Sequence, residues 1–196
     1  LYLAQSALVS QIEDVGGGER PNAVLFDVQS DQVEGIKEIF SDLDLPVMQH
    51  VPIVTMRVHS VKDVPVDQLR SEGRGRGSWA LTREYRCTYR DTLNVSETLV
   101  EGQWHGSVRG DTTYISLERG IAGNLGVTIG DSLVFDVQGV LIPVIVGSLR
   151  EVDWQRVMPN FFAVFPMGIL EAAPQFHVLV TRFGQSEQLA HLQRRS

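Results

Sequence analysis

The five histidines are the first residues to test for chemistry, because an imidazole can serve as a metal ligand or a general base. They lie at His50, His59, His105, His177 and His191. No two of them stand two or four residues apart, and none lies in a His-Glu-x-x-His block, which would place two zinc ligands on one helix face. The single cysteine, Cys87, excludes a multi-cysteine metal site and an intramolecular disulfide. The pattern predicts no metal and no cofactor, and it favours a buried, apolar role for Cys87.

Two clusters of charged and aromatic residues could hold an anion or a partner. They comprise Arg86, Tyr89, Arg90 and Asp91 in one segment, and Arg150, Asp153, Trp154, Asn160 and Phe161 in another. One interpretation is an interaction or coupling surface. The other is a strand edge with ion pairs, with Trp154 packed over a corner. The sequence leaves both interpretations open.

Ser132 is the one candidate nucleophile with a recognisable context. Gly130–Leu133 spells the nucleophile block of the GDSL-type lipases and esterases. A serine nucleophile needs a histidine base that a carboxylate orients, and that family supplies both in an Asp-x-x-His block. Here His191 has Gln188 three residues before it and His177 has Pro174. We therefore interpret Asp131 and Ser132 as turn residues and expect no enzyme activity.

Composition limits the class of protein. The chain has 196 residues, 43% of them hydrophobic and 21% charged, which fits one large globular domain or two small ones. A net charge of −7 argues against nucleic-acid binding and against docking on an anionic membrane surface. The longest apolar runs, residues 140–149 and 161–170, are about half of the ~20 residues that a membrane span needs.

Apolar spacing predicts a strand–helix–strand unit near the N-terminus. Residues 1–14 have the spacing of a helix. A strand is expected over 23–28, then a helix with Asp31 as N-cap and Glu34 three residues later. An extended segment follows over 46–58. Both chain ends are expected to continue into a longer protein.

The rest of the chain is predicted to be rich in short strands. A helix is expected near 117–125, ended by Gly126 in the left-handed conformation, and a hairpin over 132–149 turns at Gln138-Gly139. The expected organisation is a helix and first α/β unit over 1–70, a flexible linker over 71–78, an inserted β-rich lobe over 79–170, and the start of a second, truncated α/β unit over 171–196.

Many short blocks of the chain, in order and over residues 20–170, resemble one family. They are Pro21-Asn22, Phe26, Gln29–Val33, Arg83–Arg86, Thr88–Leu93, Glu97, Gly102–Trp104, Ser116–Glu118, Ala122, Leu125–Val127, Gly130-Asp131, Phe135–Gly139, Ser148–Trp154 and Pro159–Phe162. Together they resemble the extracytoplasmic (periplasmic) domain of ABC transporter permeases of the FtsX/MacB type, and more narrowly the YbbP-like branch.

This resemblance implies both a fold and a role. The implied fold is α+β, with porter-like strand–helix–strand units and an inserted β-rich lobe, like the MacB periplasmic core. The implied role is non-enzymatic: the domain couples cytoplasmic ATP hydrolysis to export or extraction of an amphiphilic cargo by an inner-membrane protein of the cell envelope. The chain has no Gly-x-x-x-x-Gly-Lys-[Ser/Thr] loop, so ATP would bind to a separate ATPase subunit.

The same resemblance implies further partners: a second extracytoplasmic permease domain, an envelope protein, or the amphiphilic cargo. No nucleic acid is expected. Two other functions remain open from the sequence alone. One is a stand-alone envelope ligand-binding module, and the other is a GDSL-like hydrolase that uses Ser132.

Overall fold

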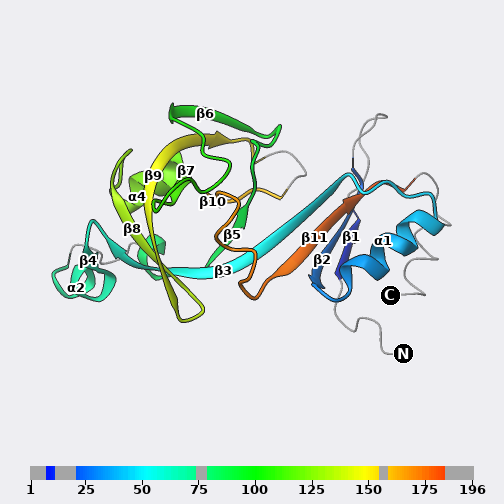
Figure 1. Ribbon diagram of the computed structural model, residues 1–196, viewed down its shortest axis with the longest axis horizontal. Helices are drawn as coiled ribbons and strands as arrows, with labels where there is room; N and C mark the ends of the chain where they lie inside the picture. The colour runs from blue at the N-terminus through cyan, green and yellow to red at the C-terminus, as the bar shows by residue number, and fades with distance from the viewer. Residues whose placement is uncertain (1–7, 12–20, 74–78, 155–158, 184–196) are drawn as a thin grey trace. The chain divides into compact units, whose positions relative to one another are not determined.

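The computed structural model describes residues 8–11, 21–73, 79–154 and 159–183. The chain forms two compact units (Figure 1). The first unit contains residues 1–53 and 175–196, and the second contains residues 54–174. The chain passes from one to the other within strand β3 (Gln49–Val61), and again between Pro174 and Gln175.

The first unit is a small antiparallel sheet with one helix packed on it. Its strands, in spatial order, are β1 (Leu8–Gln11), β2 (Ala23–Gln29), β11 (Phe176–Thr181) and the first half of β3. Strand β11 is antiparallel to both β2 and β3, so β2 and β3 run parallel to each other. Helix α1 (Val33–Asp42) connects them, which makes a split strand–helix–strand unit (Figure 1).

Helix α1 forms because its apolar residues recur at helical spacing. Val33, Ile36 and Phe40 are buried against Leu25 and Leu179 of the sheet. The helix begins later than predicted. Its N-cap is Gln32, whose side chain caps nothing inside the helix but accepts a 3.0 Å hydrogen bond from the Gln29 amide. The predicted capping role of Asp31 is therefore wrong.

The predicted N-terminal helix over 1–14 is also wrong where the structure describes it. Leu8–Gln11 is a strand whose partner is β2, with Leu8 opposite Phe26 and Gln11 opposite Ala23. Four residues have little intrinsic preference of their own, and pairing with the open edge of β2 decides their conformation. The remainder of that segment lies outside the described residues, as do residues 184–196 of the predicted second α/β unit.

The second unit is a β-barrel. Its pairings run β3–β5, β5–β10, β10–β7, β7–β9, β9–β8 and β8–β3, and so return to the strand from which they began. A closed ring leaves no open sheet edge. Strand β6 adds to the far end of β9, and β4 to the end of β3. The remaining elements are β4 (Val64–Pro65), β5 (Tyr85–Tyr89), β6 (Glu97–Gly102), β7 (Tyr114–Glu118), β8 (Ser132–Val137), β9 (Val140–Val152), β10 (Ala163–Phe165), α2 (Val66–Ser71), α3 (Trp79–Thr82) and α4 (Arg119–Leu125).

Alternating residues of the barrel strands fill its interior. Tyr85, Phe135 and Phe165 meet edge to face, with ring centroids 6.2 and 5.5 Å apart in the two pairs that include Phe135. Cys87 is fully buried beside them, as predicted. Burial raises the pKa of its thiol, which keeps the sulfur protonated and unreactive.

The limits of the units differ from the predicted domain limits. Residues 54–70 belong to the barrel unit, because β3 continues to pair with β5 and β8 as far as Val61. Of the predicted linker, Ser71 ends α2 and Gly73 has a φ of 73°. The segment 74–78 lies outside the described residues. No helix in the described ranges is long and apolar enough to cross a membrane.

The predicted hairpin and helix end are both present. Gln138 (φ 53°) and Gly139 (φ 97°) make the two-residue turn between β8 and β9. Helix α4 ends at Gly126, which is left-handed with φ 69° and ψ 34°. A Cβ atom on Gly126 would meet nothing within 4 Å. The backbone angle, and not close packing, therefore selects glycine at this position.

We expect Gly126→Val to destabilise the protein by about 1–2 kcal/mol, because a β-branched residue is strained in the left-handed region. Gly126→Asn should cost clearly less, since asparagine tolerates that region. Urea unfolding of the two variants, followed by circular dichroism, checks the difference. Equal losses for both would show that the backbone angle is not what matters.

Candidate functional site

A buried ion cluster joins the two segments that the sequence singled out. The carboxylate of Glu97, at the start of β6, lies between the guanidinium groups of Arg90 and Arg150. Arg90 Nη2 donates a short hydrogen bond to Glu97, and Arg150 Nη1 lies 3.5 Å from the other carboxylate oxygen. The side chains of Glu97 and Arg150 are fully buried. Burial lowers the pKa of Arg150 to about 10 and the Glu97 charge opposes the shift, so Arg150 stays charged at neutral pH.

The cluster contains two cations and one anion, so Glu97 cannot satisfy every guanidinium hydrogen. Arg150 Nη2 instead donates a 2.7 Å hydrogen bond to the carbonyl oxygen of Phe161. Nη1 and Nε of Arg150 and Nε of Arg90 find no hydrogen-bond partner among the described residues. The bond to Phe161 therefore attaches the segment before β10 to the buried cluster.

A second set of bonds holds the same segment from its other side. The Ser96 hydroxyl donates to the Asn160 side chain at 2.7 Å, and the Asn160 amide donates to the Asp153 carbonyl at 3.2 Å. The Asp153 amide donates to the Ser96 carbonyl at 2.8 Å. These bonds fix both ends of the connection between β9 and β10. The residues next to them, Trp154 and Phe162, are thereby held in place.

An aromatic and cationic surface lies where this connection meets helix α3. We call it the Trp/Arg surface; it consists of Trp79, Arg83, Trp154 and Phe162. The Phe162 ring lies 5.8 Å from Trp79 and 5.1 Å from Trp154, centroid to centroid. The Arg83 guanidinium lies 4.6 Å from the centroid of Trp79 and 4.7 Å from that of Phe162.

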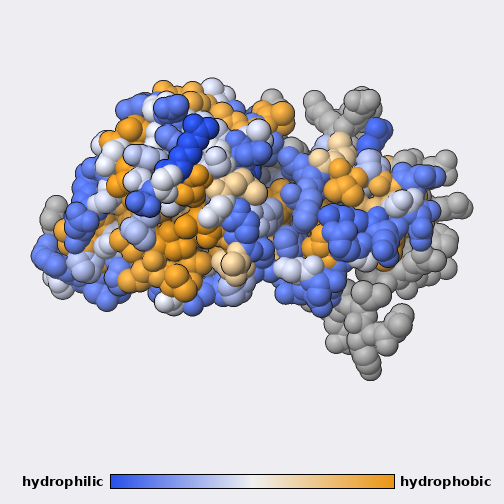
Figure 2. Space-filling model, in the orientation of Figure 1, coloured by the Kyte–Doolittle hydropathy of each residue, from blue (hydrophilic) through white to orange (hydrophobic). Residues whose placement is uncertain are grey.

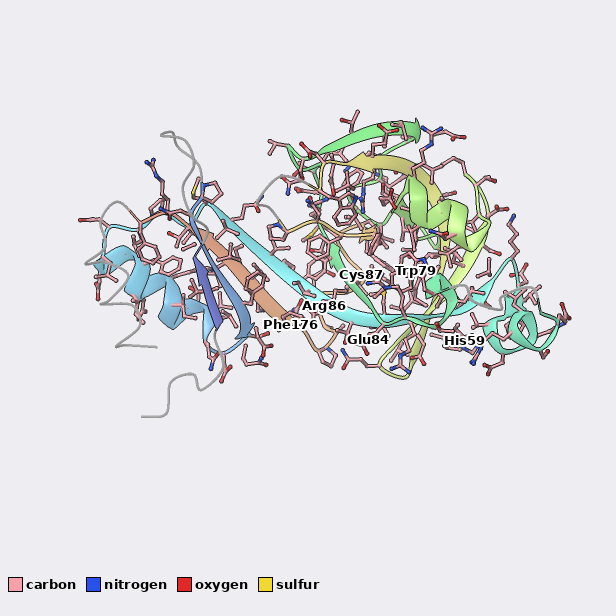
Figure 3. The ribbon with its side chains drawn as sticks, turned by 180° about the vertical axis from the view of Figure 1, so that it is seen from behind. His59, Trp79, Glu84, Arg86, Cys87 and Phe176 are labelled. Carbon is pink, nitrogen blue, oxygen red and sulfur yellow. The ribbon has the colours of Figure 1, made fainter. Side chains whose placement is uncertain are left out.

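Both tryptophans of the Trp/Arg surface face solvent, Trp79 with 44% and Trp154 with 50% of its surface exposed. Figure 3 labels Trp79 on α3 of the barrel unit. Within the described residues, no carboxylate forms an ion pair with Arg83; the neighbouring Glu84 lies 3.8 Å from Arg57 instead. Exposed indoles around an uncompensated guanidinium have the composition of a protein-binding hot spot.

The other predicted site residues lie apart from this surface. Arg86 is exposed on β5 (Figure 3), where it pairs in register with Thr55. Tyr89 is half-buried against the barrel core. The Asp91 carbonyl accepts a 2.7 Å hydrogen bond from the indole of Trp104, and the Asp91 side chain is exposed. The sequence clusters therefore split. Arg90, Arg150 and Phe161 belong to the bonds around Glu97, whereas Asp153 and Asn160 belong to the bonds around Ser96.

Sequence reasoning missed the residues that connect this site. Glu97 was noted only as part of the family resemblance, and Arg83, Trp79 and Phe162 were not proposed as site residues. One signal was available. Glu97 is an acidic residue at the start of a strand that follows a polar turn, two positions before the apolar Leu99. An acidic residue at such a place often needs a cationic partner from another strand.

Ser132 has no histidine partner among the described residues. Its hydroxyl donates to the carboxylate of Asp63 at 3.2 Å, and the adjacent Asp131 pairs with Lys62 at 2.9 Å. Asp131 also accepts the Thr128 amide at 2.7 Å, as a turn residue does. The hydrogen bonds from Lys62 and from the Thr128 amide hold the pKa of Asp131 below its usual range. His191, the candidate base, lies outside the described residues.

Apolar side chains also reach the surface on the β8–β9 hairpin. Figure 2 shows an orange area over the part of the barrel unit where Figure 1 draws this hairpin. Val140 and Leu141, just after the turn, are 64% and 51% exposed.

No group of three or more His, Cys, Asp or Glu side chains that could hold a metal ion occurs in the described part of the chain.

Comparison with known proteins finds similarity to an ABC transporter permease. No protein-family model matches the chain. The chain is 31% identical over 157 residues to YbbP, an uncharacterised ABC transporter permease of Escherichia coli (strain K12). The match covers 80% of this chain but only 18% of that permease. A solved domain assigned to a permease protein of Porphyromonas gingivalis has 14% identity and a TM-score of 0.43, over 87% of this chain and 79% of that one, which is too distant to define the fold.

The chain is therefore related to ABC transporter permeases, and its resemblance to the YbbP-like branch is confirmed. The α+β class of the fold is also confirmed, by the strands and helices that the structure contains.

We expect Glu97→Gln to destabilise the barrel unit strongly, because it leaves the buried Arg150 and the partly buried Arg90 without this counter-charge. Removing one partner of a buried ion pair costs about 3–5 kcal/mol, and the amide should retain part of the hydrogen bonding. The control is Glu151→Gln, which removes an exposed pair with Arg119 whose side chains are 60% and 66% exposed; such pairs contribute about 0–1 kcal/mol. Urea unfolding compares the two, and similar losses would show that the buried cluster is not a structural anchor.

Proposed function

We propose that this chain is a non-enzymatic, extracytoplasmic domain of an ABC transporter permease. The observation that carries the proposal is the match to the YbbP permease over 80% of the chain. In the full protein, a separate cytoplasmic ATPase would supply the energy, and this domain would couple ATP hydrolysis to movement of an amphiphilic cargo out of or through the envelope. The first unit would act as one of the porter-like units of such a domain.

The bonding of Ser132 supports a role without catalysis. The Ser132 hydroxyl donates to the Asp63 carboxylate and, among the described residues, has no histidine of the kind that activates a serine nucleophile. The one buried thiol, Cys87, is kept protonated. In the described part of the chain, the conspicuous surface chemistry is that of binding, at the Trp/Arg surface.

We assign partner contact to the Trp/Arg surface. Its occupant would be a protein segment that offers a carboxylate next to an apolar side chain. The carboxylate would pair with Arg83, and the apolar group would cover Trp79 and Trp154. A second extracytoplasmic permease domain or an envelope protein could supply such a segment. The buried cluster around Glu97 would keep the surface rigid, so that little conformational entropy is lost on binding.

Coupling to the membrane would need an element that transmits displacement. The helix predicted over residues 1–14 would have been one such element, but Leu8–Gln11 is a strand. Strand β3 is a better candidate, because it is hydrogen-bonded to β11 over Gln49–Ile53 and to β5 and β8 over Val54–Val61. Displacement of β3 would reach both units through backbone hydrogen bonds.

A cysteine placed at Val95 tests the extracytoplasmic location. Val95 is 73% exposed, whereas the native Cys87 is fully buried, so the wild-type domain should give almost no background labelling. In the intact permease, a membrane-impermeant maleimide should label Val95→Cys in spheroplasts as completely as in lysed cells. Labelling only after lysis would place the domain in the cytoplasm and overturn the proposal.

Reversal of one charge tests the contact surface. Arg83→Glu in the permease–ATPase complex should reduce ATP hydrolysis or transport severalfold, because a partner carboxylate would then be repelled. Arg109→Glu is the matched control, since Arg109 is exposed elsewhere on the barrel unit. Equal activity of both variants, with unchanged thermal stability, would show that the Trp/Arg surface does not bind a partner.

A further inference from the structure

Two histidines that are far apart in the sequence meet in the first unit. His50 Nε2 on β3 lies 3.1 Å from His177 Nδ1 on β11, and the ring centroids are 4.9 Å apart. His177 Nε2 lies 3.0 Å from the hydroxyl of Ser30, in the turn between β2 and α1. A continuous chain of hydrogen bonds therefore links β3, β11 and the turn that begins α1.

An irregularity in the sheet places His177 in this chain. Between β11 and β2, His177 pairs with Val28 and Leu179 pairs with Leu25, so one extra residue of β2 must be accommodated. Asp27 takes up the extra length with a φ of 59°. A β-bulge redirects side chains, and here it accompanies the approach of His177 to Ser30.

The geometry fixes how many protons the pair can hold. A hydrogen bond between two imidazole nitrogens needs one donor and one acceptor, so the facing His50 and His177 nitrogens share a single proton. If both rings become cationic, two N–H groups face each other at 3.1 Å and repel. The pair must then separate. Because the other nitrogen of His177 contacts Ser30, separation also disturbs the start of α1.

The charges around the pair favour its neutral state. Burial lowers the pKa of His50, and the Lys37 ammonium on α1 lowers it further, opposed by Glu34 on the same helix. Burial, the His50 ring and Lys37 together lower the pKa of His177. Lys37 also pairs with Glu34 at 2.8 Å. These are the charged groups that face the pair among the described residues.

We propose that His50, His177 and Ser30 form an acid-sensitive latch, which holds the β2–α1 turn on the sheet at neutral pH and releases it when the pair takes up a second proton. The predicted direction follows from the lowered pKa values. The released form binds more protons than the latched form, so the latch weakens as pH falls below the ordinary histidine value of 6.5 and is unaffected well above it. The latch would make the first unit responsive to the pH of its compartment.

Native-state amide exchange of the chain, followed by NMR, tests this latch. The reporters are the amides of Gln32 and Ile36, which donate to the Gln29 and Gln32 carbonyls at 2.9 and 3.0 Å. After correction for intrinsic exchange, their opening constants should be flat above about pH 7 and rise by up to about tenfold per pH unit below it, the dependence for one proton gained on opening. A flat profile over this whole range would overturn the proposal.

Two variants separate the latch from general acid destabilisation. In His50→Gln the pH dependence should disappear, because a protonated His177 can donate to both the glutamine oxygen and Ser30 without repulsion. In Ser30→Ala the opening should be high and independent of pH, since the turn is no longer tied to His177. His59→Gln is the control: His59 is exposed on β3 in the other unit (Figure 3), and its removal should leave the profile unchanged. Persistence of the pH dependence in His50→Gln, or its loss in His59→Gln, would contradict the latch.

Discussion

The constraint on which the barrel unit depends is the burial of the Glu97 carboxylate between two arginines. A carboxylate removed from water needs both a counter-charge and hydrogen bonds. Arg90 and Arg150 supply them from β5's end and from β9, so three parts of the barrel meet at this side chain. The excess positive charge has a further consequence. Arg150 also donates a hydrogen bond to the Phe161 carbonyl, and this bond attaches the surface segment that contains Phe162 to the core.

The buried ion cluster around Glu97 therefore helps to hold the exposed Trp79 and Trp154 in position. Trp154 and Phe162 sit at the two ends of the connection that Ser96, Asn160 and Arg150 hold. Phe162 in turn is the ring against which Trp79 and the Arg83 guanidinium pack. If the connection moved, the guanidinium would lose one of its aromatic faces. A rigid support of this kind suits a contact surface better than a surface of independent loops.

Local patterns in the sequence predicted local structure well. Spacing predicted β2 and the β8–β9 hairpin to within a few residues, and the Gln138-Gly139 turn and the Gly126 helix end follow from backbone angles that few residues adopt. The wrong predictions share a cause: pairing with a distant part of the chain overrides the local preference of a segment. Leu8–Gln11 has a helical stripe but pairs with β2. The closed order of the barrel strands depends on pairings between distant strands, and the spacing of apolar residues does not show which strands pair.

The site was predictable only in pieces. Arg150, Asn160 and Phe161 were identified as candidates, but nothing in the sequence showed that Glu97, more than fifty positions before Arg150, joins them. The histidine pair shows the same limit more clearly, since His50 and His177 are 127 positions apart. Isolated histidines carry no spacing signal, and only the placement of β11 beside β3 brings them together.

The two units differ in the kind of titratable group that they contain, and this difference bears on how the chain could work. In the barrel unit the central cation, Arg150, has a pKa of about 10, so it stays charged through neutral and mildly acidic pH. The Trp/Arg surface that it supports should keep its shape over that range. In the first unit the imidazoles of His50 and His177 have lowered pKa values, and the proposed latch opens when the pair takes up a second proton. A partner bound to the barrel unit would thus stay bound while the first unit opened. Strand β3 contributes hydrogen bonds to both units, so it offers one route for such a change.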